Sequence, residues 1–78
     1  MEYCLKNDIS IDALYLATTL SYGMARRFKQ GELKCSILNH ADTFIYCIYN
    51  YCGKIYGFRV NNEVFRRIFK PTVNEDWE

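Results

Sequence analysis

Residues 43–51 decide the fold, and they read Thr-Phe-Ile-Tyr-Cys-Ile-Tyr-Asn-Tyr. β-Branched and aromatic side chains fill this stretch, which is typical of a strand. Successive side chains of a strand point to opposite faces, so one face receives Phe44, Tyr46 and Ile48 and the other Ile45, Cys47, Tyr49 and Tyr51. Both faces are apolar, so a single covering helix would leave one of them exposed. A helix over residues 42–52 is the alternative, because a short apolar run is compatible with either a buried strand or a buried helix.

Two further strands are expected beside this one. Residues 32–38 alternate apolar and polar side chains, and residues 54–60 return to an extended pattern after a turn. The turn, residues 50–53, is expected to be type I with Gly53 in the left-handed conformation. The hairpin register depends on the loop length, so the sequence does not decide which residues of 54–60 lie beside which face.

Helical periodicity from Ile11 to Gln30 predicts one long N-terminal helix. Ser10 is suited to cap its first turn, Asp12 lies near the positive end of its dipole, and Gly31 ends it. Residues with helical spacing form a stripe that we interpret as a core face: Ala13, Leu14, Ala17, Leu20, Met24 and Phe28. Gly23 inside this helix costs about 1 kcal/mol relative to alanine, so either another backbone approaches it or the helix is locally weak.

A short helix is expected after the third strand. Asn61 or Asn62 is suited to cap it, and Pro71 disfavours helical conformation at Lys70. Its core positions are Val64, Phe65, Ile68 and Phe69. We therefore predict a small single α+β domain over residues 1–78 in the order α-β-β-β-α. A three-stranded antiparallel sheet carries the long N-terminal helix on one face, and a short C-terminal helix follows. Residues 1–9 are expected to be an N-terminal extension and residues 72–78 a loose acidic tail, in which Trp77 folds back or touches a partner.

Length and charge limit the classes of protein that remain. The 78 residues carry 10 Lys and Arg against 9 Asp and Glu, and 17% of them are aromatic, so the chain is neither a polybasic arm nor a disordered segment. The first residues lack a basic stretch followed by an apolar run, and residues 9–25 are too short and polar to cross a bilayer. A cytoplasmic protein without membrane contact is expected. Its four cysteines should then be thiols.

The inventory of reactive groups predicts no enzyme and no cofactor. His40 has Asp42 two residues away, which is too local for a catalytic triad, and the glycines are isolated, so no phosphate-binding loop forms. Cys52 lies at a turn beside the cation of Lys54, a setting considered for a cysteine nucleophile, but no base accompanies it. Zinc ligand types are present in Cys35, His40, Cys47 and Cys52. Their spacing lacks the close pairs of structural zinc sites, so no metal ligand is expected, and a zinc-supported module stays a second alternative.

Basic side chains gather in two segments, residues 24–34 and 59–70, each with a net charge of +3. If the two segments converge beside the tyrosines, they form a surface typical of proteins that bind single-stranded nucleic acid. The candidate contacts for this alternative, an RNA- or DNA-binding regulator, are Arg26, Arg27, Lys29 and Lys70. The simpler interpretation is that these cations are solvated.

We favour a protein-binding interpretation, because tyrosine and arginine are enriched at the energetic centres of interfaces. The partner-contact candidates are Tyr46, Tyr49, Tyr56, Arg59, Arg66 and Arg67. The expected role is stoichiometric, as a small inhibitor or adaptor of a protein partner. Homodimerisation through the uncovered face would also compensate for a small core. A chain of this size without catalytic groups is similar to the host-takeover, anti-defence or toxin-neutralising proteins of phages and mobile elements, a likeness that involves no particular residue.

Overall fold

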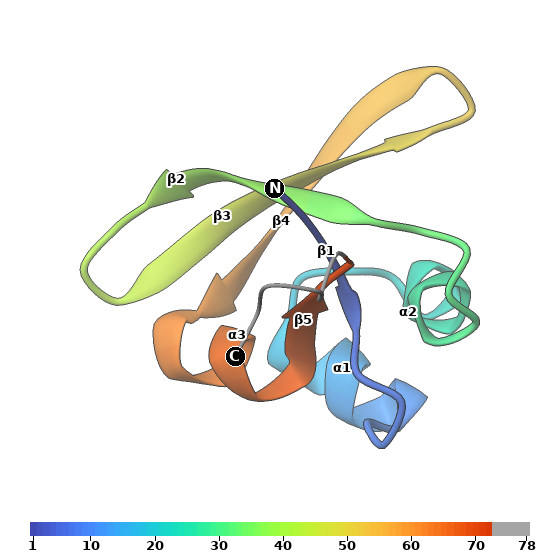
Figure 1. The fold of residues 1–78 in the computed structure, drawn as a ribbon, viewed down its shortest axis with the longest axis horizontal. Helices are drawn as coiled ribbons and strands as arrows, with labels where there is room; N and C mark the ends of the chain where they lie inside the picture. The colour runs from blue at the N-terminus through green and yellow to red at the C-terminus, as the bar shows by residue number, and fades with distance from the viewer. Residues whose placement is uncertain (73–78) are drawn as a thin grey trace.

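The computed structural model describes residues 1–72 (Figure 1). These residues form three helices and one five-stranded sheet with strand order β4-β3-β2-β1-β5, in which all neighbouring strands are antiparallel. The elements along the chain are β1 (Glu2–Leu5), α1 (Ile11–Ala17), α2 (Tyr22–Lys29), β2 (Cys35–His40), β3 (Phe44–Tyr51), β4 (Lys54–Asn61), α3 (Asn62–Ile68) and β5 (Phe69–Pro71). The predicted three-stranded sheet with one long N-terminal helix is therefore wrong.

The helix predicted over residues 11–30 is broken into α1 and α2. Thr18 leaves the helical conformation (φ −131°, ψ 178°), and its Oγ1 donates to the Leu14 carbonyl at 2.8 Å and accepts from the Leu20 amide at 3.2 Å. Ser21 Oγ then accepts from the Met24 amide at 3.3 Å and caps α2. These short polar side chains offer the backbone hydrogen bonds that compete with the helix, which explains the break.

The predicted caps at the other helix ends are confirmed. Ser10 Oγ accepts an amide of the first turn of α1, and Gly31 follows α2 with a φ of 79°. Asn61, rather than Asn62, caps α3. Gly23 lies in the first turn of α2 and not in the middle of a long helix, and apart from its chain neighbours and its own helix backbone no described atom would lie within 4 Å of a Cβ placed on it.

Strands β1 and β5 come from segments predicted to be an extension and part of the last helix. Tyr3 pairs with Cys35 of β2, and Cys4 pairs with Lys70 of β5. Backbone hydrogen bonds from Lys6 to Ile68 and from Thr72 to Glu2 extend the β1–β5 pair at both ends. Each strand is too short to show a clear alternation of apolar and polar residues. Each is stabilised by pairing with strands that are distant in sequence. Trp77 and the predicted tail from residue 73 on lie outside the described residues.

The central hairpin follows the sequence more closely. The strand predicted at 43–51 is confirmed as β3, and the one at 54–60 is confirmed as β4. The strand predicted at 32–38 begins later, at Cys35, and has a bulge between Ile37 and Asn39. A two-residue loop joins β3 to β4, and both loop residues, Cys52 (φ 55°) and Gly53 (φ 81°), are left-handed. The turn is therefore type I′ and not the expected type I.

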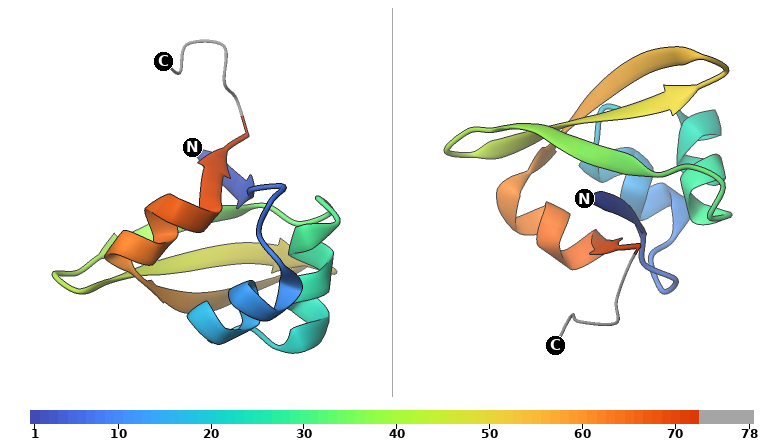
Figure 2. Two further views of the ribbon diagram at one scale, coloured as in Figure 1. Left: turned by 90° about the horizontal axis from the view of Figure 1, so that it is seen from below. Right: turned by 45° about the horizontal axis from the view of Figure 1, so that its top comes forward.

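The core lies between the curved sheet and the three helices, all of which cover the same side of the β2–β4 ribbon (Figures 1 and 2). Phe28 of α2 lies at its centre, with its ring edge-to-face against Tyr49, Phe58 and Phe69 at centroid distances of 5.5, 5.9 and 6.1 Å. Of the predicted core stripe, Leu14, Leu20 and Phe28 are buried, whereas Ala13 is exposed.

Candidate functional site

The side of β3 and β4 that faces away from the helices is the main candidate site. On β3 the side chains that point toward the helices are buried: Ile45, Cys47 and Tyr49. Those that point away are only half-buried: Phe44, Tyr46 and Ile48. The register adds Ile55 and Arg59 of β4 to the same side. These five residues are called the outer surface below, and the three helices lie on the other side of the β2–β4 ribbon (Figure 2).

Tyr46 is held on the outer surface by a glycine of the neighbouring strand. A Cβ placed on Gly57 would lie 2.5 Å from Cζ and 2.9 Å from Cε2 of Tyr46, and closer still to its Oη. The phenol ring therefore lies directly across the Gly57 backbone, in the space that any other side chain would fill. An aromatic ring over a strand glycine is a known way to fix a cross-strand neighbour.

Phe44 and Arg59 form the second fixed pair of the outer surface. The guanidinium carbon of Arg59 lies 5.3 Å from the centroid of the Phe44 ring, and the Arg59 amide donates to Thr19 Oγ1 at 3.1 Å. A cation–π contact at an exposed site contributes about 0.5–1 kcal/mol. The guanidinium of this exposed arginine is therefore held against the Phe44 ring.

The structure separates the predicted tyrosine contacts. Tyr46 and Arg59 are directly opposite each other on the outer surface. Tyr49 lies on the helix-facing side and is only 7% exposed, and burial, with a smaller effect of Tyr56, raises its pKa above the ordinary value. Tyr56 is 43% exposed and stacks on Tyr49 at 5.6 Å, so it belongs to the helix-facing side of the hairpin.

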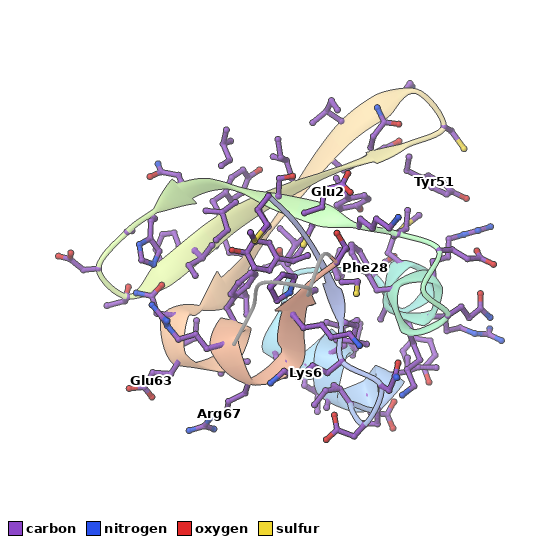
Figure 3. All side chains as sticks on the ribbon, viewed as in Figure 1. Glu2, Lys6, Phe28, Tyr51, Glu63 and Arg67 are labelled. Carbon is purple, nitrogen blue, oxygen red and sulfur yellow. The ribbon has the colours of Figure 1, made fainter. Side chains whose placement is uncertain are left out.

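The two basic segments do not converge, since α2 and α3 lie at opposite ends of the molecule in Figures 1 and 2. Their predicted contact residues are Arg26, Arg27 and Lys29 on α2, Arg66 and Arg67 on α3, and Lys70 on β5. Arg27 pairs with Glu32 at 2.8 Å and lies 5.1 Å from the Tyr51 ring centroid, and Lys29 Nζ donates to the Asn7 carbonyl. Two of the three α2 cations are therefore engaged within the chain. Figure 3 shows Arg67 projecting away from the body of the molecule.

A pocket that sequence reasoning missed lies where α3 and β5 face β2 and β3. Its volume is about 400 Å³, and its apolar walls include Ile37, Ile45 and Phe69. His40, the last residue of β2, and Arg66 are among its lining residues. No carboxylate is among the described residues that line it. No local motif marks this pocket, because its walls come from strands and a helix far apart in sequence.

The four cysteines are free thiols in different surroundings. Cys35 and Cys47 are buried together, and the hydrogen bond to Cys47, with burial, raises the pKa of the Cys35 thiol well above its ordinary value. Cys52 is exposed in the type I′ turn. Across residues 1–72 no three His, Cys, Asp or Glu side chains lie close enough to hold a metal ion, and the zinc set considered from the sequence is not assembled.

No helix in the described part of the chain is both long and apolar enough to span a membrane. Comparison of the chain with protein-family models, with curated proteins and with solved structures finds no match.

Proposed function

We propose that this chain is a non-enzymatic protein-binding module that docks its outer surface on a protein partner and acts stoichiometrically, as an inhibitor or adaptor. The supporting observation is the central strand β3, which has apolar side chains on both faces and a covering layer on only one. An apolar face without cover costs free energy in a monomer, and such faces commonly mark contacts with other proteins.

The composition of the outer surface supports this role and indicates the chemistry of the partner surface that would fit it. Tyr46 and Arg59 are of the residue types that dominate interface energetics, and their contacts with Gly57 and Phe44 hold them in place before binding. Phe44 and Ile48 are half-buried, so a partner would remove their remaining apolar area from water. We expect the partner to present an apolar patch with a carboxylate opposite Arg59.

The alternative role, RNA or DNA binding, has less support. Stacking of bases needs exposed rings beside several cations. The outer surface has a single cation, Arg59, and the cations of α2 and α3 lie apart from it and from each other. The zinc-supported alternative lacks an assembled ligand set among the described residues.

Cellular setting and origin complete the proposal. We place the protein in the cytoplasm, where reducing conditions keep the cysteines as the thiols that the fold contains. An anti-defence or host-takeover role for a phage or mobile element fits a small stoichiometric binder.

The test is quantitative capture of protein from cells with three forms of the chain. Tyr46→Ala should weaken capture of the principal partner by roughly thirtyfold, since truncating a central aromatic anchor typically costs about 2 kcal/mol. The matched control is Tyr22→Ala, because Tyr22 is 46% exposed but lies on α2, in the helical layer. Equal loss in both variants, or capture that falls steeply with salt and carries nucleic acid, would contradict the proposal.

A further inference from the structure

Strand β4 is an edge of the sheet, and the register shows which of its backbone groups point outward. Tyr51 and Lys54 close the two-residue loop, and the closing pair of such a hairpin exchanges hydrogen bonds. The pairs then alternate along β4, so its residues that hydrogen-bond to β3 are Lys54, Tyr56, Phe58 and Val60. The residues whose N–H and C=O point to the free edge are Ile55, Gly57, Arg59 and, at the end of the strand, Asn61. The Arg59 amide agrees with this assignment, because it donates to a side chain outside the sheet.

The chain shields only one half of this edge. Thr18 forms a β-bridge with Val60, and Thr19 Oγ1 accepts the Arg59 amide, so the connection between α1 and α2 covers the end of β4. No hydrogen bond within residues 1–72 engages the outward groups of Ile55 and Gly57. Residues 54–58 contain no proline and no carboxylate, and β4 has no bulge, so the usual devices that block strand addition are absent except for Lys54.

We propose that two copies of this chain pair antiparallel through the free half of β4, with Ile55 of one copy opposite Gly57 of the other. This register places a two-fold axis at Tyr56 and forms four hydrogen bonds, since each Ile55 and each Gly57 donates its amide and accepts with its carbonyl. It satisfies all the outward groups of both residues in both copies. A shift by two residues toward the end of β4 would instead bring in Arg59, whose amide is already engaged, and a shift toward the loop would set Gly57 opposite the turn residue Gly53.

The side chains fit the same register. Ile55 is 63% exposed, and it would lie opposite Gly57 of the second copy, against the Tyr46 ring that crosses that glycine. Tyr56 would face Tyr56 of the second copy, and cross-strand aromatic pairs are favourable. Lys54 would lie opposite Phe58, so no like charges face each other across the axis.

The loop geometry also fits, because Gly53 of the second copy would lie opposite Arg59. The second chain therefore turns away from β4 before it reaches Thr18 and Thr19, the residues of the α1–α2 connection that cover the end of this strand. The pairing uses backbone groups of the β4 edge and brings Ile55 of one copy against Tyr46 of the other, so it meets the outer surface at its margin. Association mass and amide exchange report the pairing, whereas partner capture reports the proposed function, so the failure of one is distinguishable from the failure of the other.

Sedimentation equilibrium over a wide concentration range tests the pairing. The wild-type mass should rise from 9.3 kDa toward twice that value. Ile55→Pro removes one outward amide per copy and no hydrogen bond to β3, and proline is tolerated at an edge position, so it should fold and weaken association roughly tenfold or more. Ile55→Val, which keeps the amide and the β-branched shape, should associate like the wild type.

Amide hydrogen exchange of the wild-type chain supplies a measurement that does not depend on the folding of a variant. Exchange at Ile55 and Gly57 should slow as the protein concentration rises, whereas exchange at Tyr56, whose amide bonds to β3, should change less. A wild-type mass that stays at 9.3 kDa at every concentration would overturn the proposal. Association that persists unchanged in Ile55→Pro would overturn it as well. So would amide exchange rates at Ile55 and Gly57 that do not change with protein concentration.

Discussion

Replacing Gly57 by alanine tests whether Tyr46 is held as the structure describes. Gly57 is not among the residues with positive φ, so its backbone accepts an L-residue, and alanine in a strand interior should gain about 0.5–1 kcal/mol over glycine. The new Cβ would, however, lie 2.5 Å from Cζ of Tyr46, which is far inside van der Waals contact. The ring must move, because the strand backbones are fixed by their ladder.

The magnitude follows from these two opposing effects. Losing a cross-strand aromatic contact costs about 0.2–1 kcal/mol, which nearly offsets the gain from alanine, so Gly57→Ala alone should change the free energy of unfolding by less than about 1 kcal/mol. In a Tyr46→Ala background no ring obstructs the Cβ, and the same substitution should stabilise by about 0.5–1 kcal/mol. The coupling energy between the two positions should therefore be on the order of 1 kcal/mol.

Urea denaturation of the four chains of this double-mutant cycle measures the coupling. Equal effects of Gly57→Ala in the two backgrounds would refute the arrangement of Tyr46 over Gly57. Partner capture gives a second readout, because Gly57→Ala should weaken capture through the displaced ring while leaving the fold intact.

Three further predictions concern the turn, the helix break and the buried phenol. Cys52→Asn should raise the free energy of unfolding by about 0.5–1 kcal/mol in urea denaturation, since asparagine tolerates the left-handed conformation that Cys52 adopts, and destabilisation would contradict the type I′ turn. Ser21→Ala should lower it by about 1 kcal/mol, because the Met24 amide loses its acceptor; a neutral result would mean that α2 does not begin at a serine cap. The pKa of Tyr49 is raised by burial, so above pH 10.0 the unfolded phenol loses a proton that the folded one keeps, and stability should fall with rising pH. Tyr49→Phe should flatten that fall, and a wild-type stability that rises with pH in this range would contradict it.

The local pattern at residues 43–51 was sufficient to predict β3, because alternation and β-branched composition agree there with the tertiary structure. The break between α1 and α2 was not predicted, since the apolar stripe continues through residues 18–21 and hides it. A signal was present in that interval: Thr18 and Thr19 followed by Ser21, which is a good helix cap.

Strands β1 and β5 could not be predicted from the sequence for a different reason. Each is only a few residues long, and its stability comes from the other and from β2, so the information lies in contacts between the two ends of the chain.

Part of the outer surface was among the contact residues expected from the sequence. Tyr46 and Arg59 are opposite each other on the outer surface, whereas Tyr49 lies on the buried side. The choice between the two faces of β3 depends on where the helices pack, which the strand's own sequence does not encode because both faces are apolar.

The most direct test of the central claim, that the outer surface contacts a protein, is photo-cross-linking from defined positions in living cells. A photoreactive phenylalanine analogue replaces Tyr46 in one version of the chain and Tyr22 of α2 in the other. The account predicts a discrete adduct with one other protein, at one-to-one stoichiometry, from position 46 and none from position 22. Adducts from position 22 with none from position 46 would contradict it.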